Sequence, residues 1–397
     1  MTRALERCQR IYNITTCLYG AQEQAPTPAD VIEEMIAQIP NDVLAEKKLR
    51  DNYCGRLRFL CLGIIRKLEQ RTTHNDEKDE ILLKEIIENE IYGNDIDPAF
   101  AETAKSTLKR MCPDLTKINL DNQDALEYNT SMNISDTVSI TNPPYQPPRG
   151  VKKGGNFYKP HVLNELKQCP LFGVTNIPMT FMVQDPLDDE NRAFRKALLD
   201  AGLRKIKHIR SDAYSANVLT IYAVWAAGYD GPVEFQTYDV DEPTQYHTLW
   251  VPRDQLYKLP LWPVARTQAE FDLAQEILGH IMKKYSYIRN KVKQQGDWCV
   301  EIEYLIGLEK ERLNKKNPLR LAPKGPKEAV RGGSKSKFIN CDSKAERDSL
   351  FDFMNTVGQT WFRTIPRGSS AENWMIGPLY ELWRDRHKSD PLFEVKA

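Results

Sequence analysis

Residues 142–145 read Asn-Pro-Pro-Tyr and directly follow a short apolar segment, residues 138–141. Pro143 and Pro144 each fix their own φ and lack an N–H, and Pro143 also keeps Asn142 out of the helical region. The Asn142 side-chain oxygen and the Pro143 carbonyl can both accept hydrogen bonds from one amine, and Tyr145 offers a flat face to a planar ring. This pattern is typical either of a turn that ends a buried strand or of a loop that holds an exocyclic amine and makes its nitrogen nucleophilic. We expect the second.

Three further polar features follow segments that look like strands. The first is the turn from Asp51 to Gly55, where glycine lets backbone N–H groups approach an anionic or zwitterionic ligand. The second is Asp95, whose carboxylate can accept from both hydroxyls of a ribose. The third is Asp124, placed to accept from the amino group of an adenine ring, although a lone Asp after a strand is commonly a turn residue. Open α/β sheets bind ligands at the carboxyl ends of their strands, so these features predict one shared site.

The segments that must position these residues alternate between strand and helix patterns, which predicts a parallel, doubly wound α/β sheet. A helix is expected from Thr27, with Thr27 as its cap and Val31, Met35 and Ile39 on one face. The other expected segments, in chain order, are a buried helix at 59–68, a strand at 88–97, a helix at 98–111, and strands at 117–120, 138–141, 176–183 and 218–226.

Length and composition indicate a globular chain of two domains, which we place at residues 1–230 and 231–397. No apolar run approaches a membrane span, and the N-terminus lacks the apolar core of a signal peptide, so we expect a cytoplasmic protein without a membrane partner. The eight cysteines form no C-x-x-C pair, which argues against a metal site. The oligomeric state stays open, with a monomer expected.

Charge is balanced overall but uneven along the chain. Residues 71–100 hold three basic and nine acidic residues, a net charge of −6, whereas residues 301–340 hold ten basic and five acidic residues, a net charge of +5. The basic, aromatic C-terminal part predicts either a nucleic-acid surface or an ordinary solvated face, with residues 313–337 as a long loop.

In this order the motifs resemble the S-adenosylmethionine-dependent DNA N6-adenine methyltransferases of the gamma order, above all those of type IIG restriction–modification proteins and phages. The resemblance covers residues 25–230 well and the remainder loosely. It implies S-adenosyl-L-methionine as cofactor, double-stranded DNA as partner, base flipping, and a C-terminal α+β target-recognition domain. It assigns cofactor binding to Thr27, Asp51, Gly55, Asp95 and Asp124, and catalysis to Asn142, Pro143, Pro144 and Tyr145. It also places Tyr214 where the family has an aromatic that stacks on the extruded base.

Leu57 departs from the family pattern, because it replaces the second Gly of the cofactor turn. We expect it to force a negative φ and to push a side chain toward the amino-acid part of the cofactor. We therefore consider three hypotheses for the function: a DNA adenine methyltransferase, the same fold acting on RNA or protein glutamine, and a non-enzymatic DNA-binding protein with a decayed cofactor site.

Overall fold

The computed structural model divides into two compact units, with unit 1 formed by residues 1–178, 196–216 and 220–233, and unit 2 by residues 179–195, 217–219 and 234–397. The residues described by the structure are 1–17, 27–127, 134–145, 157–168, 170–183, 186–210, 219–238, 245–282, 285, 288–289, 298–304, 319–325, 336–365 and 373–387. Within these ranges no helix is long and apolar enough to cross a membrane.

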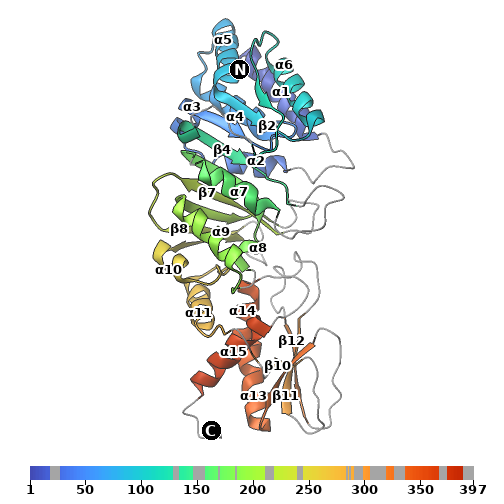
Figure 1. The fold of residues 1–397 in the computed structure, drawn as a ribbon, viewed down its shortest axis with the longest axis vertical. Coiled ribbons are helices and arrows are strands. Elements are labelled where there is room, and N and C mark those ends of the chain that lie inside the picture. Colours follow the sequence, from blue (N-terminus) through green and yellow to red (C-terminus); the bar gives the residue numbers. More distant parts are fainter. Residues whose placement is uncertain are drawn as a thin grey trace. The chain divides into compact units, whose positions relative to one another are not determined.

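Unit 1 is built on a sheet whose strands run in the order β3-β2-β1-β4-β5-β7-β6. Its strands are β1 (Lys48–Asp51), β2 (Ile91–Asn94), β3 (Asn119–Asp121), β4 (Thr137–Thr141), β5 (Phe172–Pro178), β6 (Leu203–His208) and β7 (Thr220–Ala226). Figure 1 labels β2, β4 and β7 among them. Strands β1 to β5 run parallel to one another, and β7 runs antiparallel to both β5 and β6. Such a parallel-rich sheet with helical connections confirms the predicted α/β fold class.

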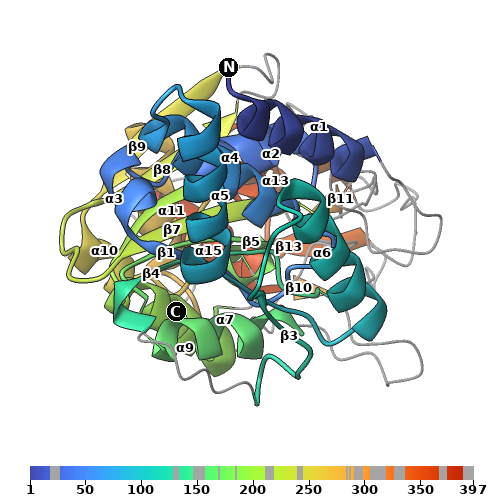
Figure 2. The same cartoon turned by 90° about the horizontal axis from the view of Figure 1, so that it is seen from above.

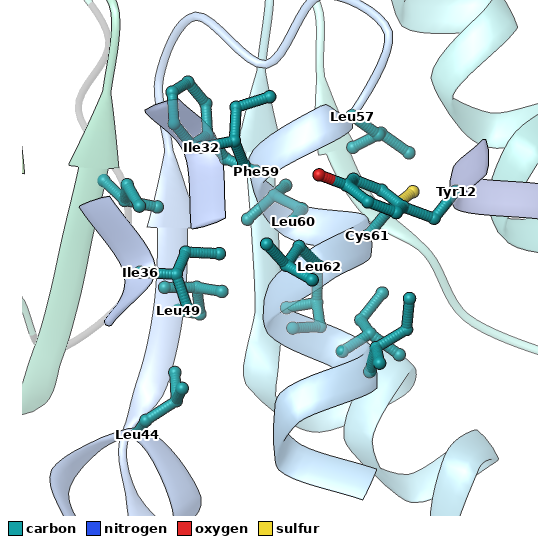
Figure 3. Packing of buried hydrophobic residues seen from close by; sticks show 14 of the residues in the cluster. Tyr12, Ile32, Ile36, Leu44, Leu49, Leu57, Phe59, Leu60, Cys61 and Leu62 are labelled. Carbon is teal, nitrogen blue, oxygen red and sulfur yellow. The ribbon is translucent and has the colours of Figure 1, made fainter. Parts of the chain in front are cut away.

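Three helices of unit 1 precede β1, and the others connect its strands. They are α1 (Arg3–Cys17), α2 (Ala29–Ile36), α3 (Asn41–Glu46), α4 (Arg58–Arg71), α5 (Asp76–Glu90), α6 (Pro98–Met111), the 3-10 turn η1 (Ile134–Asp136) and α7 (Tyr158–Lys167). Buried apolar side chains from α1, α2, α4 and β1 belong to one core cluster, in which Tyr12, Ile32, Leu49 and Leu60 are among those drawn in Figure 3.

The alternation of side chains along β1 separates two covering layers. Leu49 is fully buried against α4, where a Cβ added to Gly63 would meet its Cδ2 at 2.1 Å. Arg50 points to the opposite face, as successive strand residues must, and its guanidinium donates to Glu165 on α7. Helices α4 and α7 therefore cover opposite faces of the sheet (Figure 2).

Unit 2 contains a second sheet, antiparallel, in the order β10-β13-β11-β12 (Figure 1). The strands of this sheet are β10 (Ile288–Arg289), β11 (Trp298–Tyr304), β12 (Leu319–Lys324) and β13 (Ser336–Cys341). Unit 2 also holds β9 (Tyr246–Val251) and, apart from Val233, β8 (Val233–Tyr238), neither of which belongs to this sheet. Its helices are α8 (Thr180–Val183), α10 (Arg253–Lys258), α11 (Gln268–Leu278), α13 (Lys344–Phe353), the π-helical η2 (Met354–Gly358), α14 (Gln359–Thr364) and α15 (Asn373–Arg386), while α9 (Asp189–Asp200) contributes to both units. Helices and an antiparallel sheet together agree with the expected α+β character of the C-terminal part.

Four local predictions need correction. Thr27 does not cap α2, because the N-cap is Pro28 and no side chain caps the helix there. The strand expected at 88–97 is shorter, since residues 88–90 end α5, and residues 180–183 form α8 instead of a strand. The long loop expected at 313–337 contains β12, which pairs with β11.

Candidate active site

The sheet brings four of the predicted polar features to one edge. Parallel pairing joins β1 to β2 and β4, and β2 to β3, so the carboxyl ends of these strands lie along the same side. Asp51 ends β1, Asp95 follows β2, Asp124 follows β3, and Asn142 follows β4. These four residues are called the strand-end edge below.

Asp51 is a buried carboxyl group that is only half satisfied. It is 1% exposed, and its Oδ1 accepts from the Tyr53 N–H at 3.0 Å. Its Oδ2 is buried and has no hydrogen-bond partner among the described residues. Burial raises the pKa of Asp51 well above its ordinary value, and the nearby Asp95 and Glu165 charges raise it further. A cationic ligand group at Oδ2 would offset both effects.

Asp95 ties the cofactor turn to the second strand. Its Oδ2 accepts from the Gly55 N–H at 2.8 Å, and its Oδ1 accepts from the Asp97 N–H at 2.9 Å. Burial raises the pKa of Asp95 as well. Each carboxylate oxygen can accept a second hydrogen bond, so Asp95 keeps the capacity to bind a pair of hydroxyls. Gly55 has φ +46°, a left-handed conformation that glycine adopts without strain.

Leu57 corrects the expectation made for it. Its φ is +64°, in the left-handed region, so this leucine adopts a backbone conformation that glycine would favour and does not force a negative φ. Its side chain is fully buried in the core cluster that also holds Tyr12 and Cys61 (Figure 3). Core packing compensates for the steric cost of this conformation, and the side chain occupies the core beneath the turn.

Asp124 makes the hydrogen bonds of a turn residue. Its Oδ1 accepts from the Leu126 N–H at 2.9 Å, and its carbonyl accepts from the Glu127 N–H. The turn is held to β2 because Asn94 exchanges two hydrogen bonds with the backbone of Gln123, each 3.0 Å long. Its second carboxylate oxygen remains able to take a ligand hydrogen bond, so its cofactor role stays a prediction.

The Asn142 side chain is held at one end only. Its Nδ2 donates to the Thr27 Oγ1 at 2.8 Å, while its Oδ1 is buried and lacks a hydrogen-bond partner in the described part of the chain. Pro143 is buried, Pro144 and Tyr145 are half-buried, and the Tyr145 ring meets that of Tyr158 edge to face at 6.5 Å. Thr27 therefore lies beside the loop that was assigned to catalysis. Tyr214 lies outside the described residues.

Sequence analysis missed a buried polar cluster beneath α7, formed by Arg50, Asn52, Ser139 and Glu165 and called the α7 cluster below. Glu165 accepts from the Arg50 guanidinium, from the Asn52 amide and from the Ser139 hydroxyl, the last at 2.9 Å. All four residues are at most 2% exposed. An acidic residue on a helix reads as solvent-facing, so no local signal in the sequence marks Glu165.

His161 and two exposed apolar side chains were also missed. His161 Nδ1 lies 3.0 Å from the Tyr53 hydroxyl, its Nε2 is buried without a partner among residues the structure describes, and burial lowers its pKa. Ile96 directly follows Asp95 and is 66% exposed. Leu126 closely follows Asp124 and is 41% exposed. The sequence signal that could have identified them was their position next to Asp95 and Asp124.

Comparisons with known proteins give the following. No protein-family model matches the chain, and no curated protein matches it. Solved structures to which this chain is similar include the type IIG restriction endonuclease BpuSI, at 14% identity and a TM-score of 0.46, covering 76% of this chain and 38% of that one. They also include a type I restriction-modification methyltransferase subunit from Streptococcus thermophilus, at 14% identity and a TM-score of 0.42, covering 62% of this chain and 54% of that one. The M protein of the type I restriction enzyme EcoKI is 12% identical with a TM-score of 0.43, covering 93% of this chain and 74% of that one.

Proposed function

We propose that this chain transfers a methyl group from S-adenosyl-L-methionine to the N6 nitrogen of adenine in duplex DNA, at a specific site and after the base has been flipped out. The observation that carries the proposal is the Asn142 amide in front of two prolines and a tyrosine: it is tethered through Nδ2, and its buried Oδ1 has no partner among the residues that the structure describes. A buried acceptor without a partner is costly, and an amine that donates to it would remove that cost.

The strand-end edge fits the proposed cofactor. Its α-ammonium suits the unpartnered Oδ2 of Asp51, and its ribose hydroxyls suit the carboxylate of Asp95. Its adenine ring suits the exposed apolar side chains of Ile96 and Leu126, with Asp124 available to the exocyclic amine. A ring that covered Ile96 and Leu126 would remove apolar surface from water, at about 25 cal/mol per Å².

The chain's own contribution to the reaction is positioning and electrostatics. The cofactor supplies a methyl group on a sulfonium. Asn142 Oδ1 and the Pro143 carbonyl accept the two amine hydrogens, which localises the nitrogen lone pair and directs it out of the ring plane. Pro144 keeps the loop stiff and Tyr145 stacks on the base. No strong base is required, because the attacked amine becomes acidic as it gains the methyl group.

Two alternative functions differ from this proposal. The same site could hold an RNA base or a glutamine amide, since each presents an NH2 group on a planar carbon. The non-enzymatic alternative rested on a Leu57 that distorts the cofactor turn, and it loses that support because Leu57 has a glycine-like φ and a side chain in the core.

A methyl-transfer assay separates these functions. The purified chain is incubated with tritiated S-adenosylmethionine and, in separate reactions, with duplex DNA, structured RNA or a glutamine-containing peptide. We expect label in DNA alone, recovered as N6-methyladenine by mass spectrometry of the nucleosides. Label in RNA or peptide would support the other substrates, and DNA binding without transfer would support the non-enzymatic alternative.

A further inference from the structure

The Thr27 hydroxyl is not used where the sequence predicts it. Helix α2 begins behind Pro28 without a side-chain cap, and in its first turn the Val31 N–H donates to the Asp30 side chain and the Ile32 N–H to the Pro28 carbonyl. Thr27 is nevertheless only 5% exposed, and a buried hydroxyl requires a partner. The partner that the structure gives it is the Asn142 amide, at 2.8 Å.

The backbone of Thr27 is itself held in place. Its carbonyl accepts from Nη1 of Arg58 at 3.3 Å, and Arg58 also donates through Nε to the Thr15 carbonyl at 3.1 Å. Arg58 is 8% exposed and is the first residue of α4, directly after the cofactor turn. Pro28 fixes its own φ and restricts the backbone conformation of Thr27 before it. The Thr27 hydroxyl is therefore a fixed point, anchored to α1 and α4 and not to the loop that it contacts.

The orientation of the Asn142 amide decides what it can do. A carboxamide presents an acceptor on one side and two donors on the other, and it can turn about its last torsion. When Nδ2 is bound to Thr27, Oδ1 remains free to accept. In the opposite orientation Oδ1 would be consumed by the hydroxyl, and the amide N–H groups would face an amine that carries N–H donors of its own.

We propose that Thr27 is a positioning residue for the amine-binding loop: its hydroxyl fixes the Asn142 amide with Oδ1 turned to the substrate amine, in place of the cofactor contact that the sequence motif assigns to it. This inference rests on the proposed methyl transfer to an amino group. It makes Thr27, which precedes α2, part of the substrate-orienting machinery.

Four variants test the assignment: Thr27→Val, which keeps the shape and removes the hydroxyl, Thr27→Ser, which keeps the hydroxyl, Asn142→Ala, and the double variant Thr27→Val/Asn142→Ala. Single-turnover methyl transfer to DNA and calorimetric cofactor binding are measured on each, with thermal unfolding as the folding control. We expect Thr27→Val to slow transfer about tenfold or more, with a cofactor affinity within about twofold of wild type. Thr27→Ser should restore most of the rate.

The double variant gives the decisive comparison, because a residue that acts through Asn142 has nothing left to position once that side chain is gone. We expect its rate to equal that of Asn142→Ala alone. Additive losses, or a loss of cofactor affinity in Thr27→Val that matches its loss of rate, would overturn the proposal.

A readout without turnover separates this inference from the proposed function. In protein labelled with ¹⁵N at asparagine, the Asn142 side-chain amide is identified by its absence in Asn142→Asp, and its hydrogen exchange is measured. We expect exchange to be slow in wild type and Thr27→Ser and about tenfold or more faster in Thr27→Val. A wild type that transfers no methyl group would remove the proposed function but leave this contact tested, whereas equal exchange in wild type and Thr27→Val would remove the contact.

Discussion

Two buried carboxyl groups near the end of β1 differ in how their oxygens are used. In the α7 cluster, Glu165 accepts from three side chains and is paired with the Arg50 guanidinium. At the strand-end edge, Asp51 accepts one backbone hydrogen bond and keeps Oδ2 without a partner among the residues described. The first arrangement is complete without a ligand and the second is not. Buried polar groups that stabilise a fold can thus be distinguished from buried polar groups that await a ligand.

The largest expected effect is on stability, in the complete region. Glu165→Ala leaves the Arg50 charge, 1% exposed, without its ion-pair partner. Breaking a buried pair on one side costs about 3–5 kcal/mol, so the free energy of unfolding in urea should fall by that amount. Glu102→Ala is the matched control, because its ion pair with Lys105 is exposed and should change stability by less than about 0.5 kcal/mol. Equal, small effects of the two variants would abolish the distinction drawn above.

Variants of Leu57 test how core packing and the left-handed backbone of the cofactor turn contribute to stability. Removing a buried leucine side chain costs about 3–5 kcal/mol, whereas relief of its left-handed conformation returns about 1–2 kcal/mol in the glycine variant alone. We expect Leu57→Gly to lower the free energy of unfolding by about 2–3 kcal/mol and to be more stable than Leu57→Ala, measured side by side in urea. An alanine variant as stable as the glycine variant would contradict the positive φ of residue 57.

Asp95 belongs to the incomplete region, so its loss should affect binding. Asp95→Ala removes the acceptor assigned to the ribose hydroxyls and should weaken cofactor binding by about 1.5–3 kcal/mol in calorimetry. Asp97→Ala is the control from the same turn, because Asp97 caps α6 through the Ala99 N–H and is exposed. It should lower stability by about 1 kcal/mol and leave cofactor affinity unchanged. An unchanged affinity in folded Asp95→Ala would refute the ribose assignment.

For Asp51→Asn the expected effect is a change in how stability depends on pH. Burial raises the Asp51 pKa, so between an ordinary value of about 4 and the raised one the folded state binds more protons than the unfolded state. Wild-type stability therefore falls as pH rises through this window. The asparagine variant does not titrate, so its stability should fall less steeply than that of wild type as pH rises through this window, measured by urea unfolding at a series of pH values. The same pH dependence in both proteins would show that the Asp51 pKa is not raised by folding.

Local sequence signals predicted the parts of the fold whose causes are local. Helix α6 begins at Pro98 as expected, because Pro98 suits the first turn and the Asp97 side chain caps it. The strand that ends at Thr141 was recognisable from a short apolar run, whereas β1, Lys48–Asp51, has no such run. The left-handed Leu57 and the buried Glu165 were not predictable in this way. Local steric clashes disfavour a left-handed Leu57, and the charge of Glu165 disfavours its burial. Contacts with residues distant in sequence determine both features.

The candidate site, too, was predictable only where its causes are local in sequence. The residue types along the strand-end edge were evident from the order of motifs, since parallel strands place their carboxyl ends together. The partner of the Asn142 amide was not evident, because the contact with Thr27 joins residues far apart in the chain and a threonine before proline is ordinarily read as a cap.

Single-turnover methyl transfer by Asn142→Ala tests the central claim most directly. The variant is compared with wild type on adenine-containing duplex DNA at saturating cofactor, beside calorimetric cofactor binding and thermal unfolding. Loss of an acceptor aimed at the reacting amine should slow transfer about a hundredfold or more, with cofactor affinity and stability close to wild type. Wild-type transfer by folded Asn142→Ala would contradict the account, because the unpartnered Oδ1 would then have no part in the chemistry.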